Sequence, residues 1–583
     1  MDSEHSCGDS QPANSPASTV TRHSNGNVAD RLTVMASLLP SAVAIAQPNG
    51  PVRDDTTRSY KLTTFGALDE QSTTIAKGLI RWGVRPGMRI AMLVPFGASF
   101  IELTFALLKA GATVILIDPG IGRKHLVRCL SEAKPDGFMA IPKAQAIRTV
   151  LSRRFPDAKW NVTVGDKWYD LNWLWSGKTL SQVLELGKTA DDIKLPKIES
   201  SNPAAIIFTT GSTGPPKGVL YTHGTFHAQI DRIRDRYEIK RGSRDLACFP
   251  LFGLFDAVMG VTTIIPDMDP TRPADVNPRR LAEAAAQWEI DQAFGSPALW
   301  NTVVRWANDN DFSQPFPTLR RILSAGAPVP AATLESLRRL VHAEAEIVTP
   351  YGSTEALPIA SIESREIISE TGPASAKGKG VCVGTRFEGV SWRVVQVDDG
   401  PMDSIEQTTE MKQGKIGELM VSGPMVTDQY VVRQDQNSFH KVRDGNRVWH
   451  RMGDVGYLDS TDRFWFCGRK AHRVVCGKRT LYTVPCEAVF NAHPSVYRSA
   501  LIGRGQRPNQ TPVILIETIP ECFPKTPQDR DRLQSELLNL ASRNPLTMRI
   551  TEIIIRDKPL PVDIRHNSKI FRERLTEELQ NEH

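Results

Sequence analysis

The amino-acid sequence predicts an α/β protein, because segments with the helical period and short apolar strands alternate along much of the chain. The alternation is first visible in a helix near Leu68–Trp82, a strand Arg89–Val94, a helix Ser99–Ala110 and a strand Thr113–Ile117. Such a pattern is typical of right-handed β-α-β units on a parallel sheet. With 583 residues and 40% hydrophobic content, the chain is long enough for several folding units.

The same alternation returns in the middle of the chain. Helix candidates at Arg279–Trp288 and Ala331–Val341 flank apolar strands such as Leu319–Leu323. The tripeptide Gly326-Ala327-Pro328 forms a turn just past the end of that strand. Ligands of open α/β sheets gather at the carboxyl ends of the strands, so this turn is a candidate binding element.

The sequence pattern changes between Gly384 and Asp459, where short segments of alternating apolar and polar residues are separated by glycine turns. Strands are predicted at Val390–Val397, Gly417–Val421 and Arg447–His450, which suggests a small antiparallel β unit. After Gly468 a further segment with both helical and strand patterns runs to the end of the chain.

Composition excludes several classes of function. Seventy-one Lys+Arg residues against 65 Asp+Glu leave a net charge of +6, too small and too scattered for a nucleic-acid partner. Eight cysteines without a C-x-x-C pair are too sparse for a disulfide framework, which favours reduced thiols in the cytoplasm. The polar stretch 1–30 has no apolar h-region and is expected to be a disordered tail. Ile101–Ile117 is interrupted by Glu102 and Lys109, which argues against a membrane span.

The most informative segment, Ile206–Val219, reads IIFTTGSTGPPKGV. An apolar strand here leads into a loop of small residues that offers backbone N–H groups and hydroxyls to an anion, and Lys217 adds a positive charge. The loop contains Thr209, Thr210, Gly211, Ser212, Thr213 and Gly214. It is not a Walker A loop, because Gly218 stands where a hydroxyl should hold magnesium. A flexible surface loop is the alternative interpretation.

A second motif, Tyr351-Gly352-Ser353-Thr354-Glu355, combines an aromatic ring, two hydroxyls and a carboxylate in one turn. The ring can contact a base, the hydroxyls a phosphate and Glu355 a Mg²⁺ ion. Glu355 is therefore the candidate metal ligand, the alternative being a solvated loop glutamate.

Two further residues fall where an enzyme that uses a nucleotide needs them. Asp454, in Arg451-Met452-Gly453-Asp454, offers two acceptor oxygens to the hydroxyls of a ribose, although a turn-forming aspartate explains it almost as well. Lys569 lies near the C-terminus in a basic loop, where a lysine is normally a solvated charge.

The order of these motifs resembles the adenylate-forming superfamily of acyl-CoA synthetases, luciferases and peptide-synthetase adenylation domains, from about Leu62 to the end. The resemblance implies ATP and Mg²⁺ as cofactors. It assigns the phosphates to Thr209–Lys217 and Thr354, the adenine to Gly326–Pro328 and Tyr351, and Mg²⁺ to Glu355. The ribose is assigned to Asp454 and Arg469, and Lys569 is the mobile catalytic lysine.

Three strings most resemble the β-lactone synthetases of bacterial olefin biosynthesis: FWFCGRKAHRV at Phe464–Val474, TVPCEA at Thr483–Ala488 and PVDIRHNSKIF at Pro561–Phe571. Relatives that use coenzyme A commonly carry Asp or Lys where this chain has Ala471, and Gly where it has Ser568. These departures concern the domain rotation that admits a thiol and leave the first half-reaction untouched.

The resemblance also implies an architecture and a reaction. A large N-terminal domain (31–467), made of α/β subdomains and the small β unit, is joined by a hinge (468–471) to a mobile α+β domain (472–583). A long-chain 2-alkyl-3-hydroxy acid would be activated as its acyl-AMP, and its own hydroxyl would then close a β-lactone. Other enzymes of an olefin pathway are the implied protein partners.

Further candidates and two competing functions stay open. His223, in Tyr221-Thr222-His223, either contacts the substrate or packs and caps a helix. Phe249, Phe252, Phe255 and Phe294 either line an acyl tunnel or form plain core in a strand-and-turn segment. The competing functions are a fatty acyl-CoA or acyl-AMP ligase, which shares every first-step residue, and a catalytically dead nucleotide-binding subunit.

Overall fold

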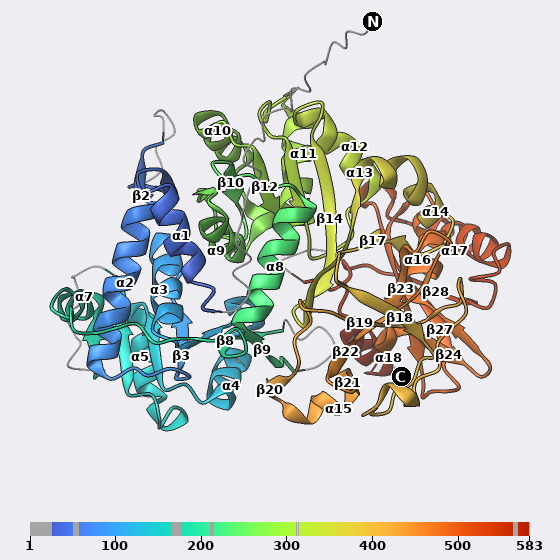
Figure 1. The fold of residues 1–583 in the computed structure, drawn as a ribbon. Helices are drawn as coiled ribbons and strands as arrows, with labels where there is room; N and C mark the ends of the chain where they lie inside the picture. Colours follow the sequence, from blue (N-terminus) through green and yellow to red (C-terminus); the bar gives the residue numbers. More distant parts are fainter. Residues whose placement is uncertain are drawn as a thin grey trace, which may run out of the picture.

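The fold is built around two large sheets, a smaller antiparallel sheet and a C-terminal domain (Figure 1). A computed structural model describes residues 26–50, 58–165, 176–209, 215–310, 312, 314–563 and 569–581. In Figure 1 most strands of the first large sheet come from the blue-to-cyan part of the chain, and most strands of the second come from the green and yellow part. The orange and red part holds the C-terminal domain. The predicted α/β class is confirmed.

The first large sheet has eight strands in the described part of the chain, and all its neighbouring strands run parallel except at one edge, where β20, β9 and β8 pair antiparallel. Its order is β20 (Tyr430–Val432), β9 (Gly218–Thr222), β8 (Pro203–Phe208), β4 (Thr113–Leu116), β3 (Arg89–Leu93), β5 (Gly137–Ala140), β6 (Trp160–Thr163) and β7 (Lys178–Thr179). Buried strands of this kind require helices on both faces.

The second large sheet has nine described strands and is parallel in its centre and antiparallel at both edges. Its order is β17 (Thr385–Arg386), β15 (Ala356–Glu363), β14 (Glu346–Ser353), β13 (Arg321–Ser324), β12 (Gln292–Gly295), β10 (Arg244–Ala247), β11 (Thr262–Ile264), β1 (Val43–Pro48) and β2 (Tyr60–Thr64).

The remaining strands form the small β unit and the C-terminal domain. The small unit contains β16 (Val381–Cys382), β23 (Phe464–Arg469), β22 (Arg447–Leu458), β19 (Gly417–Ser422), β18 (Ser391–Val395) and β21 (Lys441–Asp444), which pairs with β22. The C-terminal domain contains the hairpin β24 (Val474–Cys476) and β25 (Arg479–Leu481), and the sheet β26 (Val496–Arg504), β27 (Thr511–Thr518) and β28 (Glu552–Ile555).

Helices cover these sheets. Those of the N-terminal part are α1 (Asp30–Leu38), α2 (Phe65–Trp82), α3 (Ala98–Lys109), α4 (Arg123–Ala133), α5 (Pro142–Val150), α7 (Leu180–Lys188), α8 (His223–Arg236), α9 (Pro250–Met259), α10 (Pro278–Trp288), α11 (Pro297–Asp309), α12 (Ala331–Leu340), α13 (Ser364–Glu366), α14 (Gly372–Ala376) and α15 (Asn437–His440). Those of the C-terminal domain are α16 (Thr483–Asn491), α17 (Pro527–Ser542) and α18 (Arg572–Asn581). Within the described segments, no helix is long and apolar enough to cross a membrane.

Helix α8 lies between the two large sheets, because it contacts β9 of the first sheet and β15 of the second. Its N-terminus is capped by Thr222, whose side-chain oxygen accepts a hydrogen bond from Thr225 N at 3.1 Å. The helix therefore begins directly after the hairpin that carries Lys217, and Figure 1 shows it running through the centre of the molecule.

Two predicted elements differ from the structure. Pro250–Met259 is the helix α9, not a strand and turn, with Pro250 at the first helical position and Gly260 in the left-handed conformation at the end. The strand predicted to end at His450 continues as β22 to Leu458, so Asp454 lies in a paired strand and not in a turn.

The polar N-terminal stretch is expected to be disordered up to residue 30, but the folded body begins earlier. From Gly26 onward the chain is described, and Asn27, Val28 and Ala29 are buried. Asp30 is the first residue of α1. The start of the folded body could not be located from the sequence, because the polar residue Asn27 resembles the residues of a tail. Its side-chain Nδ2 instead donates to the buried backbone oxygen of Leu108. Residues 1–25 lie outside the described residues.

Asp245 and Asp256 form a fully buried pair of carboxyl groups between β10 and α9. The charge of Asp245 acts on Asp256, and Thr263 Oγ1 donates to Asp256 Oδ2 at 3.2 Å. Burial raises the pKa of Asp245 to about 7. Burial, and next the charge of Asp245, raise the pKa of Asp256 well above its ordinary value. Both effects favour the protonated form of Asp256.

This pair should make folding stability fall as the pH rises from about 4 to about 7. A carboxyl group with a higher pKa in the folded state stabilises the fold below its unfolded pKa and loses that contribution as the pH passes its folded value. Asp245→Asn should flatten this slope, which is at most about 1.4 kcal/mol per pH unit for one proton. Urea unfolding at pH 5 and pH 8 measures it.

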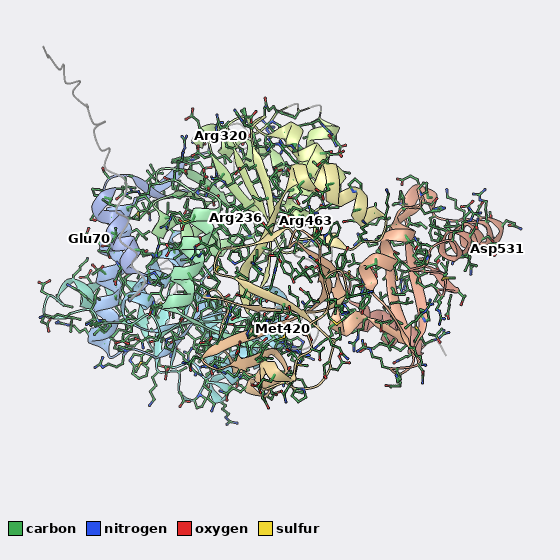
Figure 2. All side chains as sticks on the ribbon, turned by 45° about the vertical axis from the view of Figure 1, so that its right-hand side comes forward. Glu70, Arg236, Arg320, Met420, Arg463 and Asp531 are labelled. Carbon is green, nitrogen blue, oxygen red and sulfur yellow. The ribbon has the colours of Figure 1, made fainter. Side chains whose placement is uncertain are left out.

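The matched control is Asp531→Asn, at an exposed position on α17 (Figure 2). It should keep the slope of the unsubstituted protein. If Asp245→Asn keeps that slope as well, the buried pair does not titrate as described.

Candidate active site

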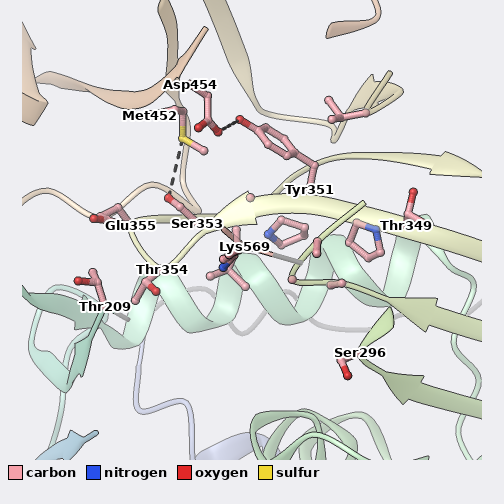
Figure 3. A pocket seen from close by; sticks show the side chains of 18 of the residues that line it. Thr209, Ser296, Thr349, Tyr351, Ser353, Thr354, Glu355, Met452, Asp454 and Lys569 are labelled. Atoms are coloured by element: carbon pink, nitrogen blue, oxygen red, sulfur yellow. Dashed lines mark hydrogen bonds between the residues drawn. The ribbon is translucent and has the colours of Figure 1, made fainter. Parts of the chain in front are cut away.

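All but one of the described residues predicted for the site line one cavity of about 1270 Å³. Both large sheets, the small β unit and the C-terminal domain contribute to its lining. The predicted residues that line it are Thr209, Lys217, Gly326, Ala327, Pro328, Tyr351, Gly352, Ser353, Thr354, Glu355, Asp454, Arg469 and Lys569. Figure 3 shows several of them projecting toward the same space from different elements. Segments separated by hundreds of residues are thus brought together.

The predicted phosphate loop connects β8 to β9, and two hydrogen bonds join its ends. Thr209 N donates to Lys217 O at 3.0 Å, and Lys217 N donates to Thr209 Oγ1 at 3.1 Å. Glycine is required at position 218, because a Cβ there would lie 2.8 Å from the side chain of Val432. The loop residues Thr210, Gly211, Ser212, Thr213 and Gly214 lie outside the described residues, so their role stays a prediction.

Lys217 and Glu355 face each other in a buried cluster of charged and aromatic side chains. Lys217 Nζ lies 4.0 Å from Glu355 Oε1, 3.2 Å from His440 Nε2 and 4.9 Å from the centre of the Tyr430 ring. The Tyr430 hydroxyl donates to Glu355 Oε1 at 2.6 Å. The ammonium and the carboxylate are therefore both held in place by neighbours.

The charges of this cluster are set by burial and by the neighbouring groups. Burial alone would raise the pKa of Glu355, but Lys217, the Tyr430 hydroxyl and Lys441 together lower it. Burial lowers the pKa of Lys441 to about 7, although Glu355 acts in the opposite direction. Burial lowers the pKa of His440 to about 3, and Lys217 contributes in the same direction. At neutral pH, Glu355 is ionised and His440 is neutral.

Asp454 joins the small β unit to the second large sheet. Arg469 NH1 donates to Asp454 Oδ1 at 2.6 Å, and the Tyr351 hydroxyl donates to Oδ2 (Figure 3). Asp454 and Arg469 are partners in the register of β22 and β23, while Tyr351 comes from β14. Burial, and next the charge of Asp454, raise the pKa of Tyr351 well above its ordinary value. The tyrosine hydroxyl therefore stays protonated and remains a donor.

Lys569 lines the cavity from the C-terminal domain. Its backbone N donates to Asp563 Oδ1 at 2.9 Å, and Asp563 N donates to Lys569 O at 3.0 Å. These bonds join the two ends of the segment 564–568, which lies outside the described residues. Three positions later, Arg572 NH2 donates to Glu487 Oε2 at 2.9 Å. Lys569 therefore lies between two positions, 563 and 572, at which hydrogen bonds hold the chain.

A protein-family profile described as AMP-binding enzyme matches residues 40–431. The chain belongs to the AMP-binding enzyme family. An olefin beta-lactone synthetase of Xanthomonas campestris is 41% identical over 94% of this chain and 96% of its own. One of Stenotrophomonas maltophilia is 40% identical over 94% and 97%. The solved structure of ATP-bound MatB from Rhodopseudomonas palustris superposes with a TM-score of 0.72 at 18% identity, covering 96% of this chain and 99% of that one, which shows the shared fold.

The cavity of this AMP-binding enzyme continues from the charged cluster into an apolar branch along α8. Phe226, Ile230 and Ile233 line it at the spacing of one helix face. Aromatic rings of the neighbouring elements also line it: Phe249, Phe252, Phe255 and Phe294. The rings of Phe252 and Phe294 are stacked with centres 3.9 Å apart. All four candidate aromatic residues therefore face the cavity. Phe252 and Phe255 come from the helix α9, Phe249 directly precedes that helix, and Phe294 comes from β12.

Among the described residues predicted for the site, His223 alone does not line the cavity. Its side chain is fully buried, and its Nδ1 accepts a hydrogen bond from Val28 N at 3.1 Å. The alternative interpretation, a packing role at the start of a helix, describes it better. In the structure of this AMP-binding enzyme, the described contact of His223 lies outside the cavity.

Four residues that line or support the cluster were missed from the sequence: Tyr430, His440, Lys441 and His450. The nearest signal was His450, a polar residue within the predicted strand Arg447–His450. His440 carried no motif, and its contact with Lys217 spans 223 positions. Lys441 supports Glu355 indirectly. Its Nζ donates to Thr427 Oγ1 at 3.1 Å, and Thr427 Oγ1 donates to the backbone oxygen of Glu355.

A buried ion pair fixes β22 against β19 beside Asp454 and Arg469. Arg451 NH2 donates to Glu418 Oε2 at 2.7 Å, and both side chains are fully buried. Lys470, directly after Arg469, reaches the other carboxylate oxygen at 3.0 Å. Glu418 thus holds two cations, one from the strand of Asp454 and one from the segment that leads into the C-terminal domain.

Glu418→Gln should lower the free energy of unfolding by about 3–5 kcal/mol, because it leaves the guanidinium of Arg451 buried without a counter-charge. Urea unfolding followed by tryptophan fluorescence measures the change. Glu185→Gln, which breaks the exposed pair of Glu185 with Lys188 on α7, should cost no more than about 0.5 kcal/mol. Equal losses of unfolding free energy in the two variants would show that the buried ion pair stabilises the fold no more than the exposed one.

Proposed function

We propose that this enzyme activates a long-chain 2-alkyl-3-hydroxy acid with ATP and closes the resulting acyl-AMP to a β-lactone, releasing AMP. The observation that carries the proposal is the similarity to two olefin beta-lactone synthetases over 94% of the chain. The cavity supports it, because a charged cluster suited to ATP continues into an aromatic-lined apolar branch suited to alkyl chains.

The nucleotide is assigned to the polar part of the cavity. Asp454 accepts the ribose hydroxyls, because one buried carboxylate offers both acceptors and Arg469 holds it in position. Tyr351 and the turn Gly326–Pro328 contact the adenine. Thr209, Thr354 and Lys217 contact the phosphates, together with the predicted loop residues 210–214.

Glu355 is proposed as the protein ligand of Mg²⁺. The group fits this role, because its carboxylate is ionised, buried and aligned by the Tyr430 hydroxyl. One carboxylate combined with substrate phosphate oxygens is a usual ligand set for Mg²⁺. When bound, the ion would neutralise charge on the pyrophosphate. Among the described residues there is no cluster of three or more metal ligands, which agrees with a metal held mainly by the nucleotide.

The first step joins two anions, so its barrier is mainly electrostatic. A carboxylate oxygen of the acid attacks the α-phosphorus, and the bond from that phosphorus to the bridging oxygen of pyrophosphate breaks. Lys569 bridges the carboxylate and the α-phosphate as charge builds up on the pentavalent centre. Lys217 holds the departing phosphates.

In the second step the 3-hydroxyl oxygen attacks the acyl carbon, the bond between that carbon and the AMP oxygen breaks, and the hydroxyl proton is released. AMP is a better leaving group than hydroxide, which makes the closure feasible. The apolar branch holds the alkyl chains and keeps water from the acyl carbon, so that the internal hydroxyl reacts first. Residues 468–471 are proposed as the hinge on which the domain with Lys569 moves.

Lys569→Ala should lower the rate of ATP–pyrophosphate exchange by about two to three decades, because it removes roughly 3–4 kcal/mol of transition-state stabilisation. The control is Lys558→Ala, an exposed lysine of the same domain. Exchange that stays near normal in Lys569→Ala would remove this lysine from the mechanism.

Product analysis separates the proposed reaction from thioester formation. The enzyme is incubated with ATP and a synthetic 2-alkyl-3-hydroxy acid, with and without coenzyme A. Lactone and AMP should appear in equal amounts regardless of the thiol. The matched acid without the 3-hydroxyl should support pyrophosphate exchange but yield no lactone.

The other outcomes identify the competing functions. AMP release that requires the thiol would indicate an acyl-CoA ligase and contradict the proposal. Absence of exchange with every acid would indicate a nucleotide-binding subunit without catalysis.

A further inference from the structure

The turn ahead of α1 connects two helices that line the cavity. Asn27 Nδ2 donates to Leu108 O at 2.6 Å, at the C-terminal end of α3. Val28 N donates to His223 Nδ1 at 3.1 Å, at the first residue of α8. The turn therefore bridges the gap between the end of α3 and the start of α8.

This turn is held firmly on both sides. Asn27 Oδ1 accepts from Ala29 N at 3.0 Å, which closes the turn on itself. Beyond the turn, the guanidinium of Arg31 donates to both carboxylate oxygens of Asp231 at 2.9 Å and to His227 Nδ1 at 2.8 Å. Since Asp231 and His227 lie on α8, the start of α1 is fixed along that helix.

Val28 presents its side chain to the cavity. It is 4% exposed and packs in the same apolar core as the neighbouring lining residues Leu108, Val114, Ala205 and Ile230. Residues of α3 and α8 line the cavity, and Val28 lines it from the turn that bridges the ends of these two helices.

We propose that Val28 is a specificity-determining residue that limits the length of the alkyl chain, and that His223 and Asn27 are positioning residues for it. The proposal rests on the proposed function, since it assumes a long-chain acid in the apolar branch. It also gives His223 a role that does not require contact with the reacting atoms.

The chemistry of His223 suits this positioning role. Its Nδ1 must be unprotonated to accept from the Val28 amide, and burial lowers the pKa of His223 to about 4, with His227 acting in the same direction. Its Nε2 has no hydrogen-bond partner among the described residues, so Nδ1 makes the bond that orients the ring.

The test is a chain-length series. Pyrophosphate exchange is measured for 3-hydroxy acids of increasing length with the unsubstituted enzyme, Val28→Phe and Val28→Ala. Val28→Phe should lower kcat/KM for the longest acids by at least about ten-fold, because it displaces about two methylenes, and leave the shortest within about two-fold. Val28→Ala should move the optimum toward longer acids.

The control is Val150→Phe, at an exposed position on α5, which should leave the length profile unchanged. Val28→Ala keeps the test decisive if the larger side chain prevents folding. If the unsubstituted enzyme is active and the Val28 variants keep its profile, the proposal is wrong while the proposed function stands. If the unsubstituted enzyme activates no acid, the proposed function and the proposal for Val28 are both wrong.

His223 is tested by a matched pair of substitutions. His223→Leu removes the acceptor, and His223→Asn keeps one near the position of Nδ1. Hydrogen exchange of the Val28 amide should accelerate by about two- to ten-fold in His223→Leu, as for the loss of one net hydrogen bond, and recover in His223→Asn. The length profile should broaden only in His223→Leu. Unchanged exchange of the Val28 amide in His223→Leu would contradict the positioning role.

Discussion

The site depends on one buried carboxylate that connects three parts of the molecule. Asp454 lies in β22 of the small β unit, is paired in register with Arg469 at the end of β23, and accepts a hydrogen bond from Tyr351 of the second large sheet. Arg469 is followed at once by the segment that leads to the domain carrying Lys569. A shift of Asp454 would therefore also disturb Tyr351, Arg469 and the segment that leads to the domain carrying Lys569. The neighbouring pair of Arg451 and Glu418 keeps the strand in place from the other side.

Burial also decides which groups carry charge. Glu355 stays ionised because Lys217, Tyr430 and Lys441 offset the cost of burial, while His440 is neutral and meets the ammonium of Lys217 with an acceptor nitrogen. Electrostatic interactions are stronger in such a site than in water, so these few groups can act on the polyphosphate of ATP. In the proposed reaction, the adjoining apolar branch along α8 would also keep water from the acyl carbon.

Much of this arrangement could be predicted from local sequence. The helix near Leu68–Trp82, the strand Arg89–Val94 and the turn Gly326–Pro328 follow from periodicity and turn chemistry, which are local properties. The helix α9 was missed because its run of aromatic and apolar residues lacks a helical period. The extent of β22 was missed because Gly453 and Gly456 look like turn residues, although pairing with β19 and β23 holds them in a strand. His223 and His440 could not be placed, because their partners Val28 and Lys217 lie about 200 positions away and no local pattern records them.

The central claim is that one cavity holds the adenylate at Asp454 and the alkyl chains along α8. The most direct test is a structure of the enzyme with a non-hydrolysable adenylate analogue, a 2-alkyl-3-hydroxyacyl sulfamoyl adenosine. The account predicts the ribose hydroxyls on the carboxylate of Asp454, the sulfamoyl group within hydrogen-bond distance of Lys569 Nζ, and an alkyl chain beside Phe226 and Ile230. An analogue bound away from Asp454, or with its chains directed into solvent, would contradict it.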